Sequence, residues 1–334
     1  MPPTWTCVPP PPVETLDAGL AEWPPLEQPT SADAQPMVPI AAAITRFTGF
    51  PSIMRRPGGA VMGVSTERPG CYRSQLFGST AVVVECVTVI EIQAVDAVQV
   101  LTLSSGRVNA LDVELLTELT DALRELGSSH GGALVLTGAG RVFSAGVDLN
   151  RVVQGGTSYT DRLIPALSDA FDAMFGYPGP TVAAINGAAI AGGCVLACAC
   201  DRRLIGAEAA IGASEVLVGV AFPVVALEVM RYACGDRAEE VLLGGRSYRG
   251  IEAVSRGLAH EVVAEDLLGV ATAQASELGD IPADAYRHTK AQLRAPAQAR
   301  MRDGGDIDRE VRQIWGSAQT QQRIAGYLER LRRR

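Results

Sequence analysis

The chain has 334 residues, of which 47% are hydrophobic and 20% charged, so it is long enough for one large or two ordinary domains with a sizeable core. Its formal net charge is −8 and its only sizeable basic cluster is Arg332–Arg334, which argues against nucleic acid as the main partner. No apolar run is long enough to span a bilayer, and the seven cysteines show no framework of spacings, as is typical of reduced thiols. We therefore expect a cytoplasmic protein with no nucleic-acid and no membrane partner.

Residues 1–80 differ in composition from the rest of the chain. Prolines recur from the Pro9–Pro12 run to Pro69, and the apolar residues form no periodic face. Such a segment cannot bury enough surface to offset its chain entropy, so we predict a disordered extension. It also lacks the charged start and apolar stretch of a secretory signal. An equally open interpretation is that translation starts later, at Met54 or Met62, and that the mature protein lacks this segment.

From Ala81 to about residue 275, strand and helix signals alternate, which is typical of an α/β core with parallel strands. Runs rich in Val, Ile and Thr and short apolar runs predict strands at 82–92, 98–103, 133–137, 181–185, 203–205, 210–211 and 258–262. Helical spacing predicts helices at 113–127 after the N-cap Asp112, at 160–175 before Gly176, at 190–199, and three or four more from Pro282 onward. We therefore divide the ordered part into a core at 81–275 and a helical region at 276–334 that packs on a neighbouring subunit.

Two glycine turns stand out within the predicted core. Residues 144–148 read SAGVD and residues 191–194 read AGGC, and each turn follows a short apolar strand and precedes a helix. Because the ends of parallel strands can lie side by side, N–H groups from both turns can converge on one point. Two such donors stabilise an oxyanion by ~3 kcal/mol each. Either turn alone would also be explained by tight packing of a helix on a strand.

Three ordered motifs connect these turns to a known family. They are NAL at 109–111, GRVFSAGVDL at 140–149 and INGAAIAGGC at 185–194, which runs on to Cys200-Asp201. From about Val82 to the C-terminus, the chain resembles the crotonase (enoyl-CoA hydratase/isomerase) superfamily. The resemblance implies an α/β fold, with a spiral core of ββα turns and a C-terminal helical trimerisation region. It further implies a homotrimer or a dimer of trimers, and an acyl-CoA thioester substrate. Coenzyme A would enter as part of that substrate, with no other cofactor and no metal.

The same resemblance assigns roles to four backbone positions. The N–H groups of Val147 and Gly192 would form the oxyanion hole that holds the thioester oxygen while an enolate forms. The backbone around Ala110 and Ala145 would bind the adenine end of coenzyme A.

One position departs from the pattern of the superfamily. Its hydratases usually carry two glutamates, and the first of those positions is Val195 in this chain, whereas the second is Glu215. Adding water to a double bond suits two carboxylates, but moving a double bond from the 3 to the 2 position needs only one carboxylate to remove and return a proton. We therefore expect an enoyl-CoA isomerase with Glu215 as its catalytic acid/base. A hydratase or another crotonase-type lyase with an unrecognised second carboxylate stays open, as does a non-catalytic acyl-CoA-binding protein.

Other polar side chains near the motifs favour structural interpretations. Asp148 is expected to cap a helix, and Asp201 to anchor the turn after its helix. Cys194, Cys198 and Cys200 are spaced C-x3-C-x-C without a second pair, which is more typical of small buried thiols than of a metal site.

Overall fold

The computed structural model describes residues 73–77, 80–84, 88–128 and 131–333. The disorder predicted for residues 1–80 falls mostly outside these residues, as do Met54 and Met62. Within them, β1 (Arg73–Phe77) pairs antiparallel with β2 (Thr80–Val84), so strand structure begins before Ala81.

The single strand predicted at 82–92 is wrong. Strand β2 ends at Val84, and β3 (Ile90–Val95) is a separate strand. At the entry to β3 the N–H groups of Val89 and Ile90 donate to the carboxylate of Glu118, at 3.3 and 3.2 Å. A tertiary contact of this kind leaves no mark in the β-branched composition of the segment, because β-propensity depends on context.

Three successive strand–strand–helix units build the centre of the fold. They are β5 (Ala133–Gly138), β6 (Val142–Ser144) and α2 (Leu149–Phe175); β7 (Thr181–Ile185), β8 (Ala188–Ile190) and α3 (Gly192–Ala199); and β9 (Arg202–Gly206), β10 (Ala210–Gly212) and α4 (Glu215–Val218). In every unit the first strand joins a six-stranded sheet and the second strand joins a four-stranded sheet. This repetition confirms the α/β spiral of ββα turns expected from the sequence.

The two sheets take up four further strands. The six-stranded sheet has the order β12-β9-β7-β5-β4-β3 and is parallel except for the antiparallel pair β3–β4. The four-stranded sheet has the order β11-β10-β8-β6, with β6, β8 and β10 parallel. Besides β3, the additional strands are β4 (Val98–Leu103), β11 (Tyr248–Arg249) and β12 (Glu261–Val263). The last of these replaces the strand predicted at 258–262, whereas 98–103 and 181–185 are confirmed.

Both faces of the inner strands β4, β5 and β7 are buried, which explains why these strands are nearly continuously apolar. Along β5, Leu134 and Leu136 pack into the main core, while Ala133 and Val135 face a second cluster against α8 (Leu267–Gly279). The period of two along a strand thus divides one apolar run between two cores.

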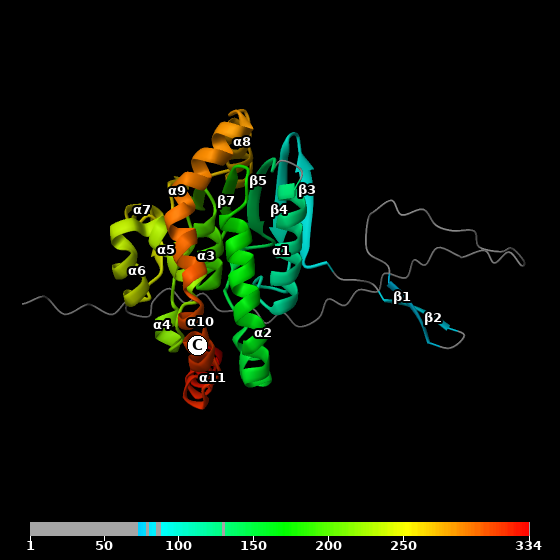
Figure 1. The fold of residues 1–334 in the computed structure, drawn as a ribbon, viewed down its shortest axis with the longest axis vertical. Helices are drawn as coiled ribbons and strands as arrows, with labels where there is room; N and C mark the ends of the chain where they lie inside the picture. The colour runs from blue at the N-terminus through cyan, green and yellow to red at the C-terminus, as the bar shows by residue number, and fades with distance from the viewer. Residues whose placement is uncertain (1–72, 78–79, 85–87, 129–130, 334) are drawn as a thin grey trace, which may run out of the picture. The chain divides into compact units, whose positions relative to one another are not determined.

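Helices cover the sheets and form the C-terminal part of the chain (Figure 1). The remaining helices are α1 (Val113–Ser128), α5 (Val224–Cys234), α6 (Ala238–Gly244), α7 (Gly250–Ser255), α9 (Ala283–Asp303), α10 (Gly305–Gly316) and α11 (Ala318–Arg332), with a 3-10 turn at Gly235–Arg237. The three tail helices α9 to α11 confirm the expectation of three or four.

Two helix boundaries differ from the prediction. Helix α2 begins at Leu149 rather than at residue 160, with a kink at Gly156 (φ 54°, ψ −146°) and Pro165 inside the helix. The glycine and proline interrupt the apolar period, so only the second half of this helix could be recognised. Helix α3 begins at Gly192, because Ile190 still belongs to β8 and Ala191 is the N-cap.

Asp201 does more than anchor a turn. Its carboxylate accepts the Thr181 N–H at 2.8 Å and the Tyr286 hydroxyl at 2.9 Å, and it pairs with Lys290 at 2.8 Å and Arg294 at 2.6 Å. Three of these four partners lie on α9. This largely buried carboxylate therefore helps to fix the first tail helix to the spiral core, together with bonds from Lys290 to the Gly179 carbonyl and from Arg294 to the Phe175 carbonyl. Helix α9 leads directly into α10 and α11.

Candidate active site

Asn109 connects the NAL turn to the first glycine turn. Its backbone lies in the left-handed region (φ 49°), which asparagine tolerates better than most residues. Its side-chain Nδ2 donates to the carbonyls of Val142 at 2.8 Å and Ala139 at 3.1 Å, and its own carbonyl accepts the Ser144 hydroxyl at 2.7 Å. These bonds place Ala110 beside the 144–148 turn.

The Val147 amide is left without an acceptor by the pairing around it. Leu111 N–H donates to the Gly146 carbonyl at 2.8 Å and Asp148 N–H donates to the Leu111 carbonyl at 3.0 Å, which forms a parallel bridge between Leu111 and Val147. In such a bridge only one of the two residues uses its own N–H and C=O, here Leu111, and those of its partner point the other way. Among the described residues, nothing accepts a hydrogen bond from Val147 N–H.

The Gly192 amide is free for a different reason. Gly192 is the first residue of α3, and the first N–H groups of a helix have no partner within it. A Cβ at Gly192 would lie 2.8 Å from the Leu111 Cδ1 atom, and one at Gly146 (φ 81°) would lie 2.7 Å from the Ile190 carbonyl oxygen and 3.4 Å from the Gly192 nitrogen. The two turns therefore touch through their backbones, and glycine permits this close approach.

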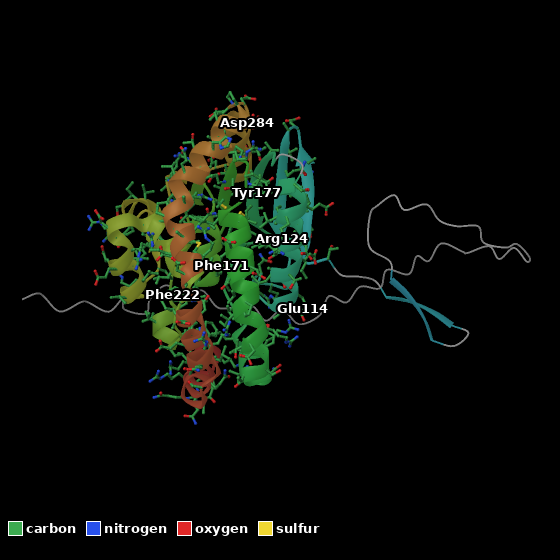
Figure 2. The ribbon with its side chains drawn as sticks, viewed as in Figure 1. Glu114, Arg124, Phe171, Tyr177, Phe222 and Asp284 are labelled. Atoms are coloured by element: carbon green, nitrogen blue, oxygen red, sulfur yellow. The ribbon has the colours of Figure 1, made fainter. Side chains whose placement is uncertain are left out.

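One cavity of about 400 Å³ brings the sequence-predicted residues together. Ala110, Ala145, Val147, Gly192 and Glu215 all line it. Apolar side chains form most of the remaining wall, among them Leu167, Phe171, Val218, Val220, Phe222, Trp315, Leu328 and Leu331. Figure 2 labels Phe171 on α2 and Phe222 in the segment that follows α4. A concave, mostly apolar site with a few converging polar groups is the usual form of a small-molecule site.

Glu215 is the exceptional polar group of this cavity. It begins α4, its side chain is 8% exposed, and its Oε2 atom has no hydrogen-bond partner among the described residues. Burial raises the pKa of its carboxyl group from 4.5 to about 8, because a charged carboxylate is poorly solvated there. A carboxyl group whose pKa lies near neutral pH can take up and release a proton easily.

Asp148 is a second carboxylate in the lining, but it is already engaged. Its Oδ1 atom accepts the N–H groups of Asn150 at 3.0 Å and Arg151 at 3.2 Å, which confirms it as the N-cap of α2. The same interpretation holds for Asp112 on α1, which accepts the Leu115 N–H at 2.8 Å.

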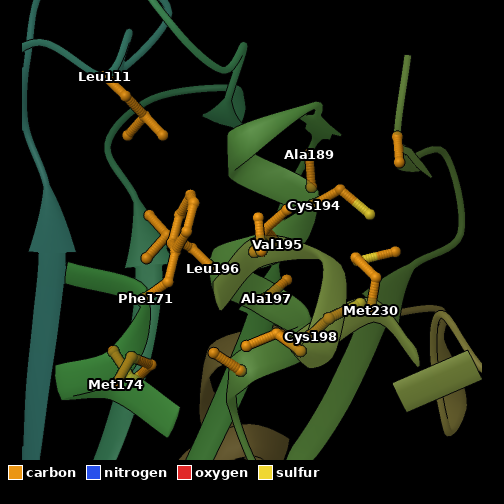
Figure 3. Packing of buried hydrophobic residues seen from close by; sticks show 14 of the residues in the cluster. Leu111, Phe171, Met174, Ala189, Cys194, Val195, Leu196, Ala197, Cys198 and Met230 are labelled. Carbon is orange, nitrogen blue, oxygen red and sulfur yellow. The ribbon is translucent and has the colours of Figure 1, made fainter. Parts of the chain in front are cut away.

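Val195 lies in the core and not on the cavity wall. Its side chain is fully buried, and Figure 3 shows it among packed apolar side chains that include Cys194 and Leu196. The position that holds a glutamate in the hydratases of the superfamily therefore contributes no polar group to this cavity.

The tail helices also contribute residues to this cavity, which the sequence did not predict. Trp315 from α10 and Tyr327, Leu328 and Leu331 from α11 line the same cavity as Glu215. The helical spacing of the three α11 residues was visible in the sequence, but an apolar stripe on a tail helix was interpreted as a contact with a neighbouring subunit.

Other candidate features lie elsewhere. A larger cavity of about 600 Å³ surrounds Asp201 and is lined by none of the predicted site residues. Cys194, Cys198 and Cys200 are free and buried, and the described residues contain no group of three metal-binding side chains. No helix among those placed by the structure is both long and apolar enough to cross a membrane.

Comparisons with known proteins place this geometry in context. The sequence model of a family described as Enoyl-CoA hydratase/isomerase matches residues 93–334. The Mycobacterium avium protein named "Probable enoyl-CoA hydratase" is 36% identical over 200 residues, which cover 58% of this chain and 77% of that protein.

Two solved structures share the fold. Human mitochondrial delta3-delta2-enoyl-CoA isomerase superposes with a TM-score of 0.70 at 27% identity, covering 74% of this chain and 99% of that chain. An enoyl-CoA hydratase/isomerase from Mycobacterium paratuberculosis gives a TM-score of 0.66 at 25% identity, with 72% and 98% coverage.

Proposed function

The chain belongs to the enoyl-CoA hydratase/isomerase family, and from that premise we propose that it moves the double bond of an enoyl-CoA thioester from the 3 to the 2 position, with Glu215 as its single proton carrier. One observation carries the proposal. The cavity holds one buried carboxyl group whose Oε2 atom has no hydrogen-bond partner in the described part of the chain, while Val195 is packed in the core and Asp148 caps α2. Two carboxylates activate a water and deliver a proton more readily than one, and the second carboxylate of this lining, Asp148, is engaged as the cap of α2.

The proposed reaction transfers one proton and forms no covalent bond to the protein. The amides of Val147 and Gly192 donate to the thioester oxygen, and the ionised Glu215 removes a proton from C2. The electron pair of that C–H bond spreads over the dienolate, and the negative charge on oxygen is stabilised by the two N–H donors. Glu215 then returns the proton to C4, so that the double bond lies between C2 and C3. Because both transfers use the same carboxyl group, a pKa near 8 suits its two roles.

The proposal also includes a binding site for coenzyme A and an oligomeric assembly. The backbone around Ala110 and Ala145, at the edge of the cavity, would bind the adenine end of coenzyme A. A homotrimer or a dimer of trimers in the cytoplasm stays a prediction, and its test is the mass of the assembly in solution by light scattering.

The experiment that tests this function is a pair of assays on the purified full-length chain. We expect conversion of 3-enoyl-CoA to 2-enoyl-CoA, followed by absorbance of the conjugated thioester, while mass spectrometry detects any hydrated product. Glu215→Gln should lower this rate by about 10²- to 10⁴-fold, the range for loss of a general acid/base. The matched control is Glu239→Gln, an exposed residue of α6 outside the cavity, which should leave the rate unchanged.

The alternatives give different results in the same assays. Rapid hydration of 2-enoyl-CoA without isomerisation would identify a hydratase or a related lyase. Tight binding of an acyl-CoA in calorimetry, without turnover of either substrate, would identify a binding protein. Either result would overturn the isomerase proposal.

A further inference from the structure

The tail helices form one wall of the cavity that holds Glu215. Trp315 is 3% exposed, and its indole Nε1 donates to the Ala221 carbonyl at 2.8 Å, in the segment that carries Val220 and Phe222 into the cavity wall. Helix α10 is thus fixed to the segment that directly follows α4, the helix that begins with Glu215.

Helix α11 reaches the other side of the site. The guanidinium of Arg332 donates to the Asn150 side-chain oxygen at 3.1 Å, three residues after the Val147 amide. Where α10 ends and α11 follows, the Thr157 hydroxyl of α2 donates to the Gly316 carbonyl at 3.2 Å. Figure 1 shows α10 and α11 beside the part of α2 that begins the helix. The tail is therefore attached to both halves of the proposed site, the hole and the carboxyl group.

We propose that Trp315 and Leu328, which we call the apolar cover, keep water out of the space beside Glu215 and so, together with the single free carboxyl group, favour isomerisation of the substrate over its hydration. This inference rests on the proposed function. A water molecule that is held in a protein needs two to four polar partners. Once the thioester oxygen occupies the Val147 and Gly192 amides, few polar partners remain beside Glu215. The Oδ1 atoms of Asp148 and Asn150 are already bonded, Ser214 and Tyr327 each contribute one hydroxyl, and the cover contributes mainly carbon atoms.

Hydration of the product would need such a water. In that reaction the water oxygen bonds to C3, one of its protons passes to the ionised Glu215, and the same carboxyl group then gives a proton to C2, with no change of oxidation state overall. An opened cover would admit water and also solvate the Glu215 carboxylate. Titratable groups that face Glu215 from other elements are Asp148 of the α2 cap, Tyr327 of α11 and Cys194 of α3, and none of them is a cation. Desolvation is therefore the main influence that the cover can change at this carboxyl group.

The test replaces one leucine of the cover with a polar residue. In Leu328→Ser, we expect the 3-hydroxyacyl-CoA product, labelled from ¹⁸O-water, to increase at least about tenfold relative to the isomerised product. We also expect the acid limb of the rate–pH profile to move down by about one pH unit, which is tenfold more carboxylate at a fixed acidic pH. Trp315→Phe keeps the ring but loses the bond to Ala221, and should shift both readouts in the same direction by less.

Leu243→Ser changes an exposed leucine of α6 outside the cavity and should reproduce the wild-type profile and product ratio. If Leu328→Ser does not fold, Leu331→Ser tests the same wall, because that side chain is 49% exposed and its loss costs little packing. An active cover variant with the wild-type product ratio and the wild-type acid limb would overturn the inference and leave the proposed function intact. A wild-type protein that isomerises nothing would instead overturn the proposed function.

Discussion

The buried carboxyl group of Glu215 should make the stability of the protein depend on pH in a way that one substitution removes. Folding raises its pKa from 4.5 to about 8 because the side chain leaves water. Between those pH values the folded chain keeps a proton that the unfolded chain has released, so the free energy of unfolding falls as the pH rises. For this one group the loss amounts to about 4 kcal/mol between pH 5 and pH 9.

Glu215→Gln keeps the shape of the side chain and cannot ionise. Urea unfolding of both proteins at pH 5, 7 and 9 should therefore show the variant gaining stability relative to wild type as the pH rises, by about 4 kcal/mol over that range. Taking the difference cancels all groups that titrate alike in both proteins. The control Glu239→Gln removes an exposed carboxylate and should follow the wild type throughout. A constant difference between Glu215→Gln and wild type would refute the buried, proton-holding carboxyl group.

Three further substitutions test the surroundings of the site. In Gly146→Ala, a residue with φ 81° gains a Cβ that lies 2.7 Å from a backbone oxygen. The rate of isomerisation in a stopped assay should therefore fall at least about tenfold while binding of coenzyme A is kept. An unchanged rate would contradict the close approach of the two turns. Val195→Glu should lower the free energy of unfolding by more than about 2 kcal/mol and create no hydratase, because its side chain enters the packed core; a stable, hydrating variant would contradict this placement. Asp201→Asn leaves Lys290 and Arg294 buried without their carboxylate and should cost about 3–5 kcal/mol in urea unfolding, whereas a near-neutral change would show that α9 is fixed by other contacts.

The central units could be predicted because local signals and tertiary structure agree there. The apolar strands 98–103 and 181–185 are buried on both faces, so their composition already specifies them. The two glycine turns were recognisable because only glycine permits their backbones to approach so closely. Their convergence on one cavity with Glu215 followed from the parallel pairing of β6 and β8.

The errors arose where distant contacts decide the structure. The break between β2 and β3 coincides with hydrogen bonds to Glu118, and the first half of α2 is hidden by Gly156. Trp315 and Leu328 could not be placed at the site, since an amphipathic helix shows which face is apolar but not what that face covers.

The bond between Asn150 and Arg332 joins residues 182 positions apart, and that distance has a consequence for synthesis. At about 5–20 residues per second, the segment that carries the glycine turn leaves the ribosome on the order of 10–40 s before the helix that covers it. During this interval Leu167 and Phe171 belong to an open apolar groove, a surface to which chaperones or other nascent chains can bind. A slower translation rate over the tail should lengthen this interval and lower the yield of folded protein.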